Sequence, residues 1–129
     1  MLGWALSGAI IVSLVVVGLG ALWAPRRWAA LYGIVLDDRR ALAFIRAMGV
    51  RDIAIGGLLA VIAYQRARTA LGWGLFLTAV VALADYVVVS ADRRAATPGS
   101  RAHVRDTRVL HATGAVGLVV VACVVLVGY

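Results

Sequence analysis

The second apolar segment of this chain is too short to cross a membrane without taking ionisable residues with it. Its uncharged run, residues 53–64, spans about 18 Å as a helix, whereas a bilayer core is about 30 Å thick. Arg66 closes the far end, so the missing turns come from the N-terminal side and carry Arg51 and Asp52 into the membrane. Ionisable groups at that depth are costly, and chains keep them where they pair or function.

The composition describes a membrane protein with one domain. Of the 129 residues, 64% are hydrophobic, whereas soluble domains average about 45–50%. The net charge of +7 comes from arginines that lie in the connections between apolar segments. We interpret them as topology signals and contacts to anionic lipid rather than as a nucleic-acid surface, since no nucleic-acid-binding motif is present. Cys123 is the single cysteine, so an internal disulfide is excluded.

The pattern predicts an all-α fold, an integral membrane four-helix transmembrane bundle with up-down-up-down topology. A single domain, residues 1–129, would contain helices at about 2–24, 41–64, 71–91 and 109–129. The first run lacks the basic start and short apolar core of a signal peptide, so we expect it to be retained. Residues 28–40 are too apolar for a free loop; they either lie in the interface, which we favour, or fold back over the bundle as a lid.

Arginine counts predict the orientation. The first and third connections hold four and five arginines and lie on one side of the membrane, whereas the second holds only Arg66 and Arg68. The positive-inside rule makes the arginine-rich side cytoplasmic and places both termini outside. We expect a bacterial-type inner (plasma) membrane.

Helix rise places four polar groups at matched depth in the cytoplasmic half, on three different helices: Arg51, Asp52, Asp85 and His111. Neighbours in a helix point about 100° apart, so Arg51 and Asp52 can face different partners. The economical arrangement pairs Arg51 with Asp85. Asp52 would then reach His111 or Arg46.

Two interpretations of these groups stay open. In the first, the groups form interhelical ion pairs that fix only the packing and register of the helices. The protein would then be a non-catalytic binding or accessory subunit. Alternatively, the groups converge on a pocket that opens to the cytoplasmic interface. A carboxylate near an arginine and an imidazole can act in general acid–base catalysis.

Our leading hypothesis is a membrane-embedded acid–base enzyme that acts on a lipophilic small molecule, as an isomerase, cyclase or epoxide-opening enzyme. Asp52 and Asp85 would transfer protons, Arg51 would stabilise an anion, and His111 would assist at the mouth. The remaining candidates, for substrate binding, are Arg46, Tyr86, Gly56 and Gly114. Gly56 and Ala60, four residues apart, are also spaced for close helix packing.

A third hypothesis is a small transporter. It would need a homo-oligomer, because the outer half of the chain offers no polar path across the membrane. The expected partners are the lipid bilayer and the lipophilic substrate, and self-association is a further hypothesis. We assign no cofactor and no metal, since His103 and His111 are eight residues apart and lack metal-ligand spacing.

Several short motifs together resemble the four-helix membrane proteins of domain-of-unknown-function family 4267, which are DoxX-like in shape. The most specific of them is Gly49-Val-Arg-Asp-x-x-x-Gly56. The others are Pro25-Arg26, Tyr32-Gly33-Ile34, Asp85 and His111-Ala112. The resemblance covers nearly the whole chain and implies the membrane fold and the importance of these polar residues. It implies no reaction. Tyr86 after Asp85 is bulkier than the resemblance leads us to expect and would narrow a pocket.

Overall fold

A computed structural model describes residues 1–31, 39–95 and 105–128 of the chain, with the side chains of residues 31, 39–41, 88–95 and 105–113 left undescribed. Every regular element in this part of the chain is a helix. The all-α class that the hydropathy pattern predicts is therefore confirmed.

The described residues form five helices: α1 (Leu2–Trp23), α2 (Pro25–Leu31), α3 (Arg39–Tyr64), α4 (Arg68–Ala95) and α5 (Arg105–Val127). Within this part of the chain, three stretches are long and apolar enough to cross a membrane, namely Leu2–Trp23, Leu42–Tyr64 and Arg68–Val87. The described apolar part of α5, Gly114–Val127, is shorter. These spans identify an integral membrane protein.

The helix ends follow from local chemistry. Pro25 has no backbone N–H to continue α1 but suits the first position of a helix, and α2 begins there. At the end of α3, Arg66 adopts a left-handed conformation with φ of +57°. The Arg66 N–H donates to the carbonyl of Ala63 and the Ala67 N–H to that of Ile62. This pair of bonds satisfies the last carbonyls of α3 and turns the chain into α4.

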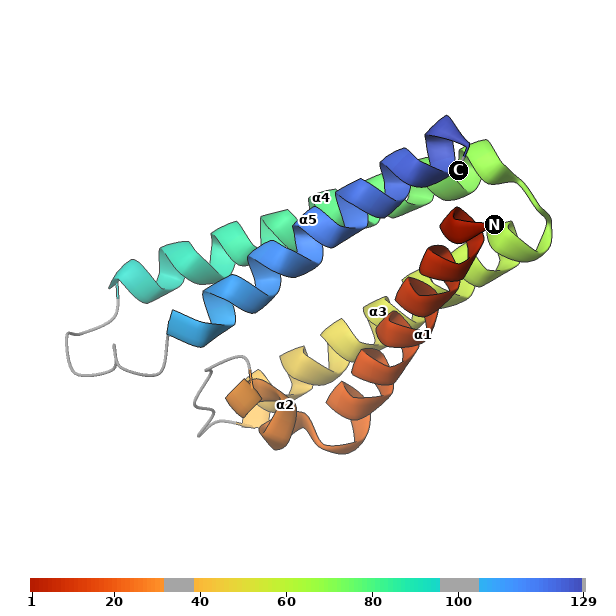
Figure 1. Ribbon diagram of the computed structural model, residues 1–129. Coiled ribbons are helices and arrows are strands. Elements are labelled where there is room, and N and C mark those ends of the chain that lie inside the picture. Colours follow the sequence, from red (N-terminus) through yellow and green to blue (C-terminus); the bar gives the residue numbers. More distant parts are fainter. Residues whose placement is uncertain (32–38, 96–104, 129) are drawn as a thin grey trace.

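The helices form two pairs that diverge from a common end. The α1 helix lies along α3, and α4 lies along α5 (Figure 1). The turn between α3 and α4 lies at the end where the pairs meet, and both chain termini lie there too (Figure 1). We call this the closed end. The two pairs separate towards the opposite end, which we call the open end.

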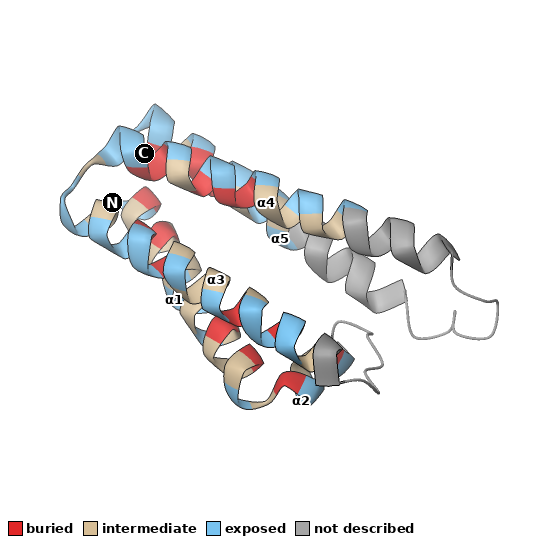
Figure 2. Ribbon diagram, turned by 180° about the vertical axis from the view of Figure 1, so that it is seen from behind, coloured by how far each residue is buried: buried red, intermediate tan, exposed pale blue. Residues whose placement is uncertain are grey.

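The largest buried cluster lies towards the closed end. Leu59, Leu71 and Leu75 are almost fully buried, and α5 adds Val121, Ala122 and Val125. Partly buried side chains of α1, among them Trp4 and Ile11, pack against this cluster. Buried positions form stripes along the helices, while exposed positions face outward (Figure 2). The outer faces of the helices are also apolar, which suits a bilayer. The cluster therefore reflects packing between helices and not the removal of apolar side chains from water.

The closest helix contact joins α1 to α3 at two glycines. A Cβ added to Gly49 would lie 2.6 Å from the Gly18 carbonyl oxygen, and one added to Gly18 would lie 2.6 Å from that of Gly49. Gly56 is also buried, against Val15 and neighbouring residues of α1. Ala60 is exposed, so its predicted role in close packing is wrong. Gly49 and Gly56 are seven residues apart, and this spacing places both on the face of α3 that meets α1.

The short helix α2 folds back on the pair formed by α1 and α3. Ala29 is buried with Ala21 and Ile45. The Trp28 indole lies against Gly20, where any Cβ would overlap it. Of the segment 28–40 that we expected in the membrane interface, Trp28 and Ala29 thus pack against α1 and α3. Residues 32–38 lie outside the described part of the chain.

Truncating Leu75 tests the buried cluster. Leu75→Ala should lower the free energy of unfolding in mixed micelles by about 2 kcal/mol. Leucine truncations in soluble cores cost about 2–5 kcal/mol, and the low end applies because apolar surroundings replace water outside the helices. Leu77→Ala is the matched control on the same helix, since Leu77 is 61% exposed. Equal losses in both variants would contradict the packing described above.

Candidate functional site

One face of α3 carries an aspartate within its packing stripe. Ile45, Gly49, Gly56 and Leu59 are buried, and they alternate at spacings of four, seven and three residues. Asp52 occupies the same stripe, midway between the two glycines. Its side chain is 17% exposed. The Asp52 side chain is partly buried because α1 approaches α3 closely at Gly49, one turn before it, and at Gly56, one turn after it.

The second aspartate lies on the corresponding face of α4. Leu71, Leu75 and Thr78 are buried, and Asp85 follows Thr78 at heptad spacing on the same face. The Thr78 hydroxyl donates to the Gly74 carbonyl at 2.8 Å, so it is satisfied within its own helix. Asp85 has no such local partner in the described part of the chain; its bonds go to α3.

Arg51 joins the two carboxylates. Its guanidinium meets Asp85 in a two-point contact, with Nη1 3.2 Å from Oδ1 and Nη2 2.8 Å from Oδ2. It also folds back on its neighbour, with Nε 3.2 Å and Nη2 3.1 Å from Asp52 Oδ1. We call Arg51, Asp52 and Asp85 the triad. Two parallel N–H···O bonds of this kind are strong and directional.

The triad crosses from one helix pair to the other. Asp52 lies about 18 Å along α3 from Tyr64, and Asp85 about 25 Å along α4 from Arg68. Both therefore lie past the middle of a bilayer core about 30 Å thick, on the side where the pairs diverge (Figure 1). The side chains of Arg51 and Asp85 keep 37% and 31% of their exposure. The triad is thus paired without being sealed.

The structure partly matches the predicted pairing. The contact between Arg51 and Asp85 is present. Asp52, expected to reach His111 or Arg46, accepts two hydrogen bonds from Arg51 and none from another described residue. The arginine side chain is long enough to turn back over the next residue, which a helical-wheel argument based on Cβ directions overlooks. The side chain of His111 and all of His103 lie outside the described residues.

The four predicted substrate-binding residues occupy different surroundings. Tyr86 is partly buried beside Asp85, and Arg46 is exposed on α3. Gly56 lies in the contact with α1. Gly114 is exposed on α5, and a Cβ added there would meet nothing within 4 Å. Gly56 therefore shares the packing stripe of Asp52, one turn away. No hydrogen bond or ion pair of a described residue joins Gly114 to the triad.

Sequence reasoning missed a second group of polar contacts, at the closed end. Arg68 Nε donates to the Val125 carbonyl at 2.6 Å. The Arg66 guanidinium carbon lies 5.6 Å from the centre of the Trp4 ring. The sequence signal was present in the two arginines of the second connection, which we interpreted as topology signals and lipid contacts and not as parts of a site.

The composition of the triad determines its charge. Within the described part of the chain, no three histidine, cysteine, aspartate or glutamate side chains gather as metal ligands. When all three groups are ionised, two carboxylates and one guanidinium carry a net charge of −1. A single proton neutralises the triad, and low-polarity surroundings favour neutral states.

Comparison with known proteins supports the membership that the motifs suggested. Searches against curated proteins and solved structures found no match. A family model described as a domain of unknown function, DUF4267, matches residues 9–126. That range includes the close contact of α1 with α3 and all three residues of the triad. Because the match covers most of the sequence, this chain belongs to the DUF4267 family.

Proposed function

We propose that this protein is a membrane-embedded acid–base enzyme that acts on a lipophilic small molecule. One observation carries the proposal: a single guanidinium holds two carboxylates on different helices. Of the two, Asp52 uses only Oδ1, and its Oδ2 accepts no hydrogen bond from a described residue. A carboxylate with a free oxygen beside a fixed positive charge is suited to take and return a proton.

The proposed roles follow from the contacts. Asp52 exchanges a proton with the substrate through Oδ2, and Asp85 is the second proton-transfer group. Arg51 holds both carboxylates and stabilises negative charge that develops on a substrate oxygen. His111 would assist at the mouth of the site. Reactions that need only these groups are isomerisation, cyclisation and epoxide opening.

Access for the substrate would come from the lipid between the diverging helix pairs. Arg51 and Asp85 each keep about a third of their exposure, so an apolar molecule would not have to pass through water to reach them. We further propose that the helices form an up-down-up-down four-helix bundle in a plasma membrane. Its open end would face the cytoplasm, with both termini outside, as the arginine distribution favours.

A second candidate is a non-catalytic accessory subunit. The direct contacts of 2.8–3.2 Å within the triad favour it, since such pairs fasten helices to one another. The two candidates differ in what a conservative substitution does. Removing one carboxylate charge abolishes activity in an enzyme, but in an accessory subunit it changes only stability or partner binding.

Deuterium transfer from solvent tests the enzyme proposal. The purified protein is incubated in D2O with a panel of lipophilic epoxides and unsaturated carbonyl compounds, and products are analysed by mass spectrometry. We expect turnover of at least one class. Asp52→Asn and Asp85→Asn should each reduce it about 10²-fold or more, because positioned proton transfer contributes about 10²–10⁴-fold.

Arg26→Gln is the control for this experiment, because Arg26 is exposed on α2 and is not part of the triad. It should turn over substrate at the wild-type rate. Unchanged turnover in both asparagine variants would refute the acid–base assignment. If every compound is inert and the variants lose only thermal stability, the accessory role is the better explanation.

A further inference from the structure

Two arginines lie at the closed end, with no aspartate or glutamate in the helix segments that meet there. Arg66 and Arg68 flank the turn from α3 to α4. The sequence has no aspartate or glutamate between Asp52 and Asp85, nor in residues 1–36 and 107–129. All the helix segments that meet at this end fall within those ranges. No aspartate or glutamate of these segments therefore balances the two arginines.

Arg68 is held in place with part of its guanidinium still available. Its Nε donates to the Val125 carbonyl, which fastens the side chain to the last turns of α5. Gly128, with φ of +107°, lies against the same guanidinium, and any Cβ there would overlap Nη2. Neither Nη atom donates to a described residue. The structure thus presents two parallel donors of the kind that pair with phosphate oxygens.

Arg66 is held beside it at a conformational cost. Its left-handed backbone, with φ of +57°, is a conformation that glycine adopts far more readily. The side chain lies over Trp4 in a cation–π contact. It forms no ion pair with a described residue. Strained positions persist where the surrounding structure requires them, and they are enriched at ligand sites.

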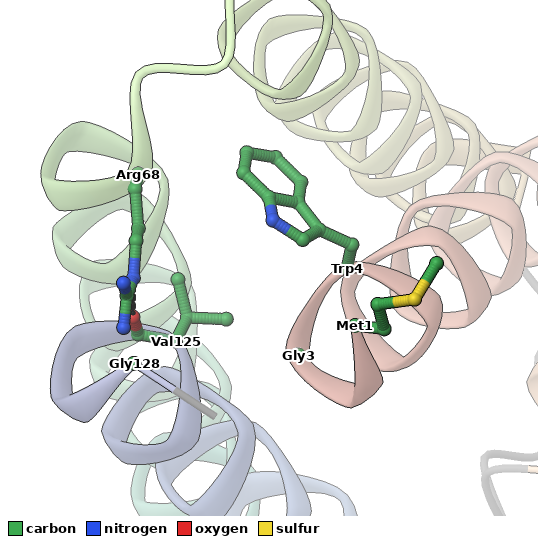
Figure 3. Close-up of a pocket in the computed structure, with 6 residues that line it drawn as sticks. All are labelled: Met1, Gly3, Trp4, Arg68, Val125 and Gly128. Atoms are coloured by element: carbon green, nitrogen blue, oxygen red, sulfur yellow. Dashed lines mark hydrogen bonds between the residues drawn. The ribbon is translucent and has the colours of Figure 1, made fainter.

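A small recess lies beside Arg68 and Trp4. It has a volume of about 60 Å³ and is lined by Met1, Gly3, Trp4, Arg68, Val125 and Gly128. Trp4 of α1 and Arg68 of α4 lie on opposite sides of it (Figure 3). The recess is therefore large enough for a small polar group.

We propose that this recess binds a phosphate group, as carried by a phospholipid headgroup. The membrane-spanning stretch of α4 begins at Arg68, which places the recess at the level of lipid headgroups. Tryptophan is enriched at the same level. The phosphodiester would accept hydrogen bonds from Arg68 and balance the charge of Arg66, while the acyl chains remain in the bilayer. This site lies at the opposite end from the triad and does not depend on the proposed enzyme activity.

Native mass spectrometry of the detergent-purified full chain tests the site. The probes are dioleoyl phosphatidylglycerol, dioleoyl glycerol, which lacks the phosphate, and inorganic phosphate. We expect the wild type to retain phosphatidylglycerol and not dioleoyl glycerol. The double variant Arg66→Gln/Arg68→Gln should bind phosphatidylglycerol at least about tenfold more weakly, because it loses charge-assisted hydrogen bonds.

Two further variants separate the site from net charge and from folding. Arg26→Gln/Arg27→Gln removes the same charge from exposed positions on α2 and should bind like the wild type. Gly128→Ala keeps both arginines but displaces the Arg68 guanidinium, so it should also weaken binding. If the double variant does not fold, Gly128→Ala decides the question.

Each outcome has a defined meaning. Retention of the phospholipid alone supports a lipid headgroup as the ligand. Displacement of the lipid by inorganic phosphate, which then binds in its place, supports the same chemistry with a soluble phosphate as the source. Equal retention of dioleoyl glycerol, or wild-type binding by the double variant and Gly128→Ala, would overturn the proposal.

Discussion

Replacing Arg51 with methionine should lower the free energy of unfolding by about 3 kcal/mol, among the largest effects of any single substitution in this chain. Among the described residues, Arg51 is the cation that contacts both Asp52 and Asp85, and the change removes it. Breaking a buried pair by removing one partner costs about 3–5 kcal/mol, because the other charge is left unpaired. We place the effect at the low end because Arg51 and Asp85 are a third exposed. Reversible unfolding in mixed micelles measures it.

A double-mutant cycle isolates the bridge between the helix pairs. Arg51→Met, Asp85→Asn and the double variant together give the coupling energy of the contact. The double variant should be more stable than Arg51→Met alone, because it leaves one unpaired carboxylate instead of two. A coupling energy near zero would mean that the two-point contact contributes nothing to the fold.

Two comparisons sharpen this result. Arg46→Met removes an exposed arginine from the same helix and should cost much less. Arg51→Lys should lie between, since an ammonium keeps the charge but lacks the planar geometry of the two-point contact. Lowering the pH should reduce the penalty of Arg51→Met, because protonated carboxyl groups no longer need a cation.

Replacing Gly49 with valine should separate α1 from α3 and cost about 3 kcal/mol. The added Cβ would lie 2.6 Å from the Gly18 carbonyl oxygen and 2.9 Å from the Ala21 Cβ. Backbone and Cβ atoms cannot move aside by changing rotamer, so the helices themselves must shift. Overpacked interiors typically lose about 1–3 kcal/mol, and contact with backbone places this site at the high end. Unfolding in mixed micelles again provides the measurement.

Gly57→Val is the matched control for the helix contact. Gly57 lies on the same helix, but a Cβ added there would meet nothing within 4 Å. Both variants change helix propensity in the same way, so their difference reports the contact with α1. Similar stabilities would show that α1 and α3 approach each other less closely than the structure indicates.

The two effects meet at Asp52. This residue follows Gly49 by one turn and precedes Gly56 by one turn, so the glycine contact sets how near it lies to α1. On its other side, Arg51 carries the connection to α4. The same short motif therefore packs one helix pair and fastens it to the other. A reaction at the triad would depend on both contacts, because proton transfer requires groups held in position.

The fold class, the membrane spans and the presence of charges within them follow from the sequence. Hydropathy depends on local composition, and helix rise converts residue numbers into depth. That argument placed Arg51, Asp52 and Asp85 at matching depth, and the pairing of Arg51 with Asp85 followed from charge. Similarly, Pro25 determined where α1 stops because proline lacks the N–H that a continuing helix needs.

Tertiary structure decided the rest. The depth of a residue in the membrane does not specify which way its side chain points around the helix. The long Arg51 side chain folds back, so it reaches Asp52 as well as Asp85. The choice of Gly18 and Gly49 over Ala60 as the close contact depends on which face of α3 meets α1. The recess at the closed end brings together residues from three helices. Such positions depend on long-range packing, which no local pattern of residues encodes.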